Sequence, residues 1–267
     1  MSNLLATTKI SVDKSNSIIA FTTTGNENWK VWDRFLTIEG KPAYHIGNVC
    51  DTCQFFFERL EGANKSISPA EVSETLGNGL QSLDSSLLDK IKLILPVGEY
   101  AAMLLSITPH KVSLGSDSDY FVNEQTKLWG IDGFWGLPHS PKVEYYRTLT
   151  KKFDDYKQLF EFVVPMYPSG WLGVDAVREY ESQISEGLKP TALALSVLDI
   201  KQPASWEDAD DEVEIKEHWC LTHYLLDGHH KVYATSNLEK PITMLSFLAV
   251  KQSIATEVNI ATLLDIL

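Results

Sequence analysis

The feature that most constrains the fold of this 267-residue chain is a short block in which an apolar run stops at Asp227-Gly228. The preceding Tyr-Leu-Leu run at 224–226 is typical of the end of a buried strand, and Asp-Gly suits a tight turn with positive φ. His229, His230 and Lys231 then begin a segment that we expect to be helical. The block therefore predicts a strand, a tight turn and the first turn of a helix in direct succession.

The first turn of such a helix is a natural place to bind an anion. Its backbone N–H groups lack partners within the helix, and the helix dipole favours negative charge there. Gly228, His229, His230 and Lys231 are the residues that we expect to contact a phosphate, because two imidazoles and an ammonium group at this end are destabilising unless an anion offsets them. The alternative is structural: Asp227-Gly228 makes a turn, one histidine is satisfied in the core, and Lys231 lies at the surface.

The Asp-Gly-His-His-Lys block resembles the strand-turn-helix box of the ParB/sulfiredoxin-like superfamily. Its members include chromosome-partitioning nucleotide-binding proteins, sulfiredoxins and free-serine kinases. The segment at 174–193 resembles the helix, glycine and strand that precede this box, and the segment at 240–245 resembles the strand that follows its phosphate-binding helix. The similarity covers residues 159–250 and implies a module of this fold in the second part of the chain.

The residues of the block separate the chemistries of that superfamily. His229 occupies the position of the sulfiredoxins' nucleophilic cysteine. Only 36 residues follow Lys231, so we do not expect the helical DNA-binding domain of the partitioning proteins. The free-serine kinases carry Asp-Gly-His-His-Arg, the most similar version. Lys231 replaces their arginine, and the segment at 167–171 contains no acid where those kinases have a carboxylate base.

The resemblance implies a nucleotide- or phosphate-binding protein, and in its fuller form an ATP-dependent phosphotransferase that acts on a small molecule with magnesium. Asp227 and His229 would then be the catalytic residues. The alternative is a non-catalytic protein that binds a ligand or a partner and carries a degenerate form of the box.

The charge of the chain bears on its partners. It has 23 Lys and Arg against 36 Asp and Glu, a net charge of −13. Binding to DNA depends on neutralising phosphates, so we expect no DNA partner. A small anionic ligand or nucleotide needs only one local pocket and stays compatible with this charge.

No run approaches the ~20 apolar residues of a membrane span, and the first residues do not resemble a signal peptide, so we expect a cytoplasmic protein without a membrane partner.

Cys50 and Cys53 form a CxxC pair ahead of an aromatic run. Three interpretations are open: two small thiols with a structural role, a redox dithiol, or half of a zinc site. Zinc needs four ligands, for which His45 and the distant Cys220 are the further candidates, and the zinc site is not the favoured interpretation. Only three cysteines are present, which argues against a framework of disulfides.

We expect an α/β protein of the mixed α+β kind with two modules. Residues 1–158 would form an N-terminal mixed module that carries the CxxC pair, and residues 159–267 the ParB/sulfiredoxin-like module, because the composition changes near residue 158. The segment at 144–157 is expected to be a polar helix, and the acidic segment at 201–217 an exposed insertion before the next strand.

Overall fold

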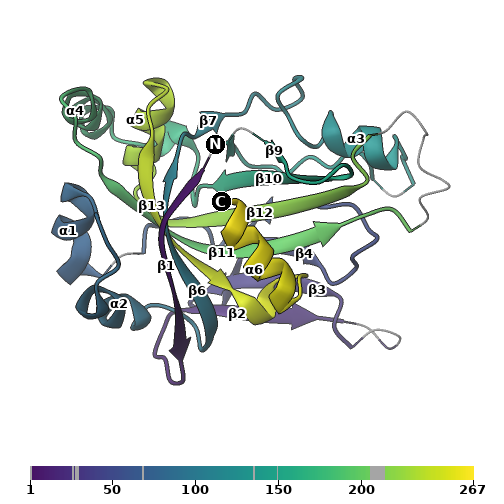
Figure 1. Ribbon diagram of the computed structural model, residues 1–267, viewed down its shortest axis with the longest axis horizontal. Helices are drawn as coiled ribbons and strands as arrows, with labels where there is room; N and C mark the ends of the chain where they lie inside the picture. Colours follow the sequence, from purple (N-terminus) through teal and green to yellow (C-terminus); the bar gives the residue numbers. More distant parts are fainter. Residues whose placement is uncertain are drawn as a thin grey trace.

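A computed structural model of the chain describes residues 2–25, 27, 30–67, 69–134, 136–148, 150–204 and 214–267. It contains two β-sheets with helices at their faces and ends, which confirms the prediction of a mixed α/β fold (Figure 1). Most of the predicted acidic insertion, residues 205–213, lies outside the described residues. Among the described helices, none combines the length and the apolar character needed to cross a membrane.

The larger sheet has nine strands. Two of its strand pairs, β10 with β12 and β11 with β13, are parallel, and the remaining pairs are antiparallel. In spatial order the strands are β1 (Asn3–Val12), β6 (Gly98–Ile107), β13 (Ile242–Ala249), β11 (Thr191–Lys201), β12 (Glu217–Asp227), β10 (Lys157–Val164), β8 (Tyr146–Arg147) and β7 (His110–Lys111), with β9 (Lys151–Lys152) also paired to β10.

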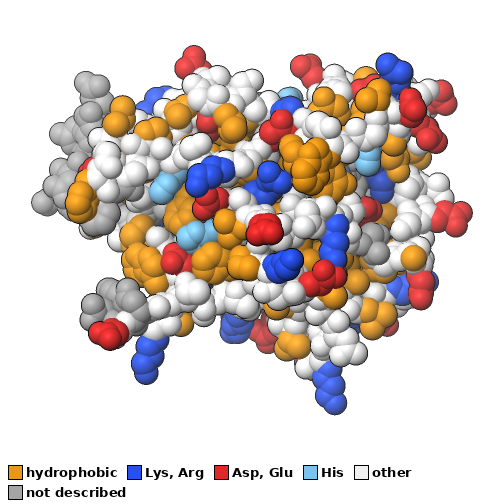
Figure 2. Space-filling view, turned by 180° about the vertical axis from the view of Figure 1, so that it is seen from behind, with side chains coloured by type: hydrophobic (Ala, Val, Ile, Leu, Met, Phe, Trp, Pro, Cys, Tyr) orange, Lys and Arg blue, Asp and Glu red, His pale blue; other side chains and the backbone are white. Residues whose placement is uncertain are grey.

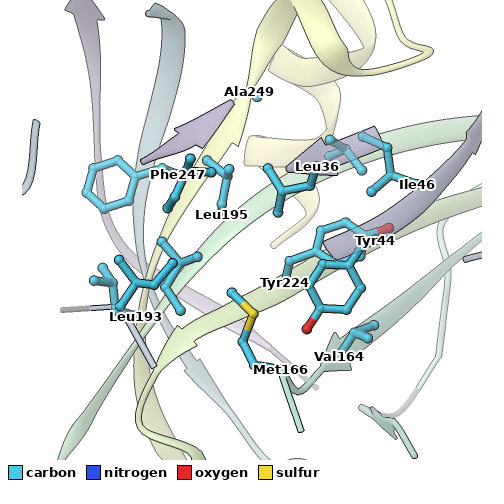
Figure 3. Close-up of a cluster of buried hydrophobic side chains, with 14 of the residues drawn as sticks. Leu36, Tyr44, Ile46, Val164, Met166, Leu193, Leu195, Tyr224, Phe247 and Ala249 are labelled. Carbon is cyan, nitrogen blue, oxygen red and sulfur yellow. The ribbon is translucent and has the colours of Figure 1, made fainter. Parts of the chain in front are cut away.

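The smaller sheet is antiparallel and has four strands: β2 (Ile19–Thr24), β3 (Asp33–Ile38), β4 (Lys41–Asn48) and β5 (Glu58–Arg59). The main core lies between the two sheets (Figure 3). Leu36 and Tyr44 of the smaller sheet face Leu195 and Tyr224 of the larger one, and the two tyrosine rings lie 4.8 Å apart. The central strands of the larger sheet are therefore buried on both faces, which explains their nearly continuous apolar runs.

Helices cover the other face and one end of the larger sheet. Figure 1 shows α6 (Glu257–Ile266) lying over that face, and α4 (Val174–Ser185) beside α5 (His229–Asn237) at one end. The α6 side chains Ile260 and Leu263 pack into a second core on this face. The remaining helical segments are η1 (Ala70–Val72), α1 (Ser73–Asn78), α2 (Ser85–Lys92), α3 (Glu124–Trp129), η2 (Ser169–Trp171) and η3 (Val250–Gln252).

The larger sheet is continuous across the predicted module boundary at residue 158. That residue lies within β10, and β6 from the first part of the chain pairs along its length with β13 from the last part. The change in composition that suggested a boundary is the start of a buried strand in the sheet. Apolar residues of residues 1–158 and 159–267 consequently share one core.

The predicted helix at 144–157 is wrong. The described residues of this segment contain the short strands β8 and β9, both paired with β10. Tyr145 and Tyr146 are buried, and aromatic residues favour strands when a neighbouring strand offers a surface to pack on. The pairing with β10 outweighs the helical preference that the Lys-rich composition suggested.

One buried ion pair joins the two sheets. Arg34 of β3 contacts the carboxylate of Asp199 in β11, with Arg34 Nη1 3.1 Å from Asp199 Oδ1. The same guanidinium donates to the carbonyl oxygen of Gln252, and the Ile254 N–H donates to Asp199 Oδ1. Both charged groups are buried and are paired with each other and with backbone groups, although Arg34 Nε is a buried donor without a hydrogen-bond partner among the described residues.

Candidate functional site

The predicted strand, turn and helix at 224–231 are confirmed. Strand β12 ends at Asp227, Gly228 is left-handed with φ 93° and ψ 23°, and α5 begins at His229. A Cβ atom at position 228 would lie 3.0 Å from both Cα and Cβ of Ala192 on β11. Glycine is therefore required by the backbone conformation and by the closeness of the neighbouring strand.

This turn lies at the carboxyl ends of two parallel strands. Val164, the last residue of β10, is in register with Tyr224 of β12. The residues that follow β10 therefore reach the first turn of α5, where Met166 and Tyr167 contact His229. In open α/β sheets, ligands bind in the crevice at the carboxyl ends of the strands.

His229 is buried and uses both ring nitrogens within the protein. Its Nε2 accepts a hydrogen bond from the Met166 N–H at 3.0 Å, so Nδ1 carries the proton and faces Ser66 Oγ at 3.2 Å. The ring stacks on Tyr167 with a centroid distance of 4.2 Å. Burial, with a smaller contribution from His230, lowers the pKa of His229 to about 3. This imidazole is neutral at physiological pH.

His230 is also a neutral acceptor, because its Nε2 accepts from the Gly173 N–H at 3.1 Å. Burial lowers the pKa of His230, and the nearby Asp227 carboxylate only partly opposes this. Lys231 is buried, and its ammonium donates to the Thr191 carbonyl oxygen at 3.0 Å and lies 3.9 Å from Asp227 Oδ2. The helix start therefore does not carry the expected cluster of cations: Lys231 is the cationic side chain of the three, and the Asp227 carboxylate accompanies it.

The backbone of the first turn and an aromatic ladder remain available for a ligand. The leading N–H groups of α5 have no partner within the helix, as at every helix start. His229, Tyr167 and Trp171 form a stack that leads outward, with Tyr167 and Trp171 centred 6.3 Å apart at an interplanar angle of 19°. The Trp171 side chain is 63% exposed. The sequence interpretation missed Ser66, Met166, Tyr167, Trp171 and Gly173 as neighbours of the turn.

A second polar group lies on the face of the larger sheet that α6 covers. We call it the buried polar row; it runs across five neighbouring parts of the sheet and comprises Ser246, Ser196, His223, Glu161 and Thr148. His223 Nε2 is 3.0 Å from Glu161 Oε1, and its Nδ1 is 2.7 Å from Ser196 Oγ. The order serine, imidazole, carboxylate is that of a hydrolase triad, but each of the five is at most 3% exposed, so no substrate reaches it in this conformation.

The carboxylate of this row is fully satisfied. Burial disfavours ionisation of Glu161, but hydrogen bonds from His223, Ser2 and Thr148 outweigh it and hold the pKa of Glu161 below its ordinary value. The row is therefore a structural network in which buried polar side chains of neighbouring strands hydrogen-bond to one another. A sequence signal existed, because Ser196 and His223 each interrupt a long apolar strand, but their pairing depends on strand register.

The CxxC pair is a disulfide, which differs from two free thiols and from half of a zinc site, and is compatible with the redox interpretation. Cys50 Sγ and Cys53 Sγ are 2.00 Å apart. The other proposed ligands have different partners: His45 Nε2 is 3.0 Å from Asp33 Oδ1, and the buried Cys220 Sγ is 3.7 Å from the Tyr120 hydroxyl. Within the described part of the chain, no three His, Cys, Asp or Glu side chains are arranged to hold a metal ion.

Comparison with known proteins yields no relative. No protein-family model matches the chain, and no curated protein or solved structure matches it. The ParB/sulfiredoxin-like resemblance therefore stays a prediction that rests on the block at 227–231 and its flanking segments.

Proposed function

We propose that this protein binds a small phosphate-bearing molecule, of the mononucleotide class, at the first turn of α5. The observation that carries the proposal is the placement of Gly228 and the start of α5 at the carboxyl ends of β10 and β12, beside an exposed aromatic side chain. Phosphate groups are recognised at such helix starts by backbone N–H groups and the helix dipole.

The donors for the phosphate differ from those that the sequence suggested. With both histidines neutral, backbone N–H groups at the start of α5 supply most of the hydrogen bonds. His230 accepts from Gly173 through Nε2, so its Nδ1 carries the ring proton and is a donor on a half-exposed side chain. The Lys231 ammonium, which contacts the Thr191 carbonyl oxygen and lies beside Asp227, adds positive charge near the turn.

The aromatic ladder supports a nucleotide rather than phosphate alone. Trp171 stacks on Tyr167 and exposes much of its ring. A base stacked on an aromatic side chain gains about 1–3 kcal/mol. The charge of the protein also favours a mononucleotide over a long polyanion such as DNA. Basic and acidic side chains are interspersed on the face shown in Figure 2, and the net charge is −13.

We favour the non-catalytic form of this function. Both His229 nitrogens are occupied by Met166 and Ser66, so this imidazole is not positioned to exchange protons with a substrate. Asp227 is the carboxylate at the turn and lies beside the Lys231 ammonium. An ATP-dependent phosphotransferase with magnesium would have to use Asp227 as its base or metal ligand, and it is the second candidate.

Isothermal titration with ATP, ADP, AMP and inorganic phosphate, each with and without magnesium, tests the proposal. Trp171→Ala should weaken ATP binding by about tenfold, as expected for one lost stacking contact, and leave phosphate binding unchanged. Phe134→Ala, which removes another exposed aromatic ring, is the matched control. No binding of any of these ligands at millimolar concentration would refute the proposal. ADP formed in the presence of hydroxylated small molecules would instead establish the phosphotransferase.

A further inference from the structure

The disulfide lies in a loop whose two cysteines are partly exposed. Cys50 and Cys53 are both half-buried, in the connection between β4 and β5, whereas Cys220 is fully buried in the core. The function proposed for the α5 turn makes no use of this loop. Any reaction of the disulfide is therefore independent of ligand binding at the α5 turn.

The loop is held in place by its backbone, independently of the disulfide. Three successive carbonyl oxygens accept hydrogen bonds from outside the loop: that of Cys50 from Lys201 Nζ at 2.5 Å, that of Asp51 from the Gln202 N–H at 3.1 Å, and that of Thr52 from Trp129 Nε1 at 3.2 Å. The Cα atoms of the two cysteines are 5.4 Å apart. Since these contacts do not involve sulfur, the cysteines stay adjacent when the S–S bond is broken.

The surroundings of the two sulfurs are unequal. Thr52 Oγ1 lies 3.5 Å from Cys50 Sγ and can donate to a thiolate there. The buried Lys201 ammonium donates to the carbonyl of the same cysteine, and the Asp199 and Asp51 carboxylates lie near it, so its charge does not by itself favour a thiolate at the sulfur. A hydroxyl donor stabilises a thiolate by hydrogen bonding to the charged form. Cys50 is therefore the better leaving group.

From these contacts we infer that Cys50 and Cys53 form a reversible redox site that exchanges with dithiols. A thiolate of an external dithiol attacks Cys53 Sγ, the S–S bond breaks, and its electron pair passes to Cys50 Sγ as a thiolate. The second thiolate of the reagent then attacks its own sulfur in the mixed disulfide and releases Cys53, and both cysteines take up protons. The reagent is oxidised to its disulfide, and the protein gains two electrons and two protons.

The test is to equilibrate the native full-length protein in buffers of reduced and oxidised dithiothreitol at graded ratio, alkylate it with iodoacetamide and locate the label by mass spectrometry. Cys50 and Cys53 should become labelled together over the range of the buffers, while Cys220 stays unlabelled. A pair that stays oxidised until the protein is denatured would show a purely structural disulfide. A purified protein that carries metal on two reduced cysteines would equally overturn the inference.

The direction of exchange is tested separately, in a Cys53→Ser background in which Cys50 is a single reactive thiol. Thr52→Val should slow alkylation of Cys50 at pH 7 by about twofold to threefold, because loss of the hydroxyl donor raises the thiol pKa and lowers the thiolate fraction, while the higher nucleophilicity of the more basic thiolate offsets part of that loss. Thr8→Val, on the exposed side of β1, is the matched control. An unchanged rate in the Thr52 variant would contradict Cys50 as the leaving thiolate.

Discussion

Two buried histidines at the same end of the larger sheet show how differently one side chain is used. His229 bonds a backbone N–H and a serine, stacks on Tyr167, and belongs to a group whose outer member is exposed. His223, on the adjoining strand, lies between the Glu161 carboxylate and two serines, and all of these groups are sealed in the core. The set with the order of a hydrolase triad is thus the inaccessible one, whereas the set at the α5 turn includes an exposed aromatic ring. Access, rather than residue type, distinguishes the two.

The largest expected effect comes from breaking the buried polar row. His223→Ala removes a hydrogen-bond donor from the buried Glu161 carboxylate and leaves the Ser196 hydroxyl with one partner fewer. Loss of one partner of a buried charged group costs about 3–5 kcal/mol. Urea denaturation should show a loss of unfolding free energy in this range. A loss below about 1 kcal/mol would mean that water enters the row, and the contrast in access between the two regions would disappear.

Acid should destabilise the region around His229. Burial lowers the pKa of His229 to about 3 from an ordinary 6.5, and does the same for His218, which lies outside this region on β12 beside the Tyr120 hydroxyl. The unfolded chain then binds more protons than the folded chain between these values, so stability is complete above about pH 6.5 and is lost as the pH falls. Each histidine should account for about 2 kcal/mol between pH 7 and pH 5. Urea titrations of the wild type and of His229→Gln at both pH values measure this, and an equal pH dependence in the two proteins would contradict a buried neutral His229.

The smallest loss of stability is expected at His230, the more exposed of the two histidines at the start of α5. His230→Ala removes the acceptor of the Gly173 N–H, but this side chain is only half-buried and water can replace it. The expected loss is about 0.5–1 kcal/mol, the usual net value of one hydrogen bond. Thermal denaturation of His230→Ala beside His223→Ala compares the two regions directly. A larger loss at His230 than at His223 would reverse the assignment of structural and accessible roles.

The strand, turn and helix at 224–231 were predictable because their signals are local: an apolar run, an Asp-Gly turn and polar residues at a helix start. The charge state of the turn was not, because Ser66, Met166 and Gly173 come from distant parts of the chain. The same limit explains the error at 144–157, where pairing with β10 decides the structure. Mixed α/β character was predictable from the strand, turn and helix block and its flanking segments, but the single nine-stranded sheet depends on long-range pairing of β6 with β13.

The ion pair between Arg34 and Asp199 has a consequence for the order of folding. Its partners are 165 residues apart in sequence, and the pair also engages the backbone at Gln252 and Ile254. Closing so long a loop costs entropy that only the finished contacts repay, so the pair belongs to a late step of folding. The pairing of β6 with β13 also closes a long loop, so the larger sheet and its contact with the smaller sheet would be completed at similarly late steps.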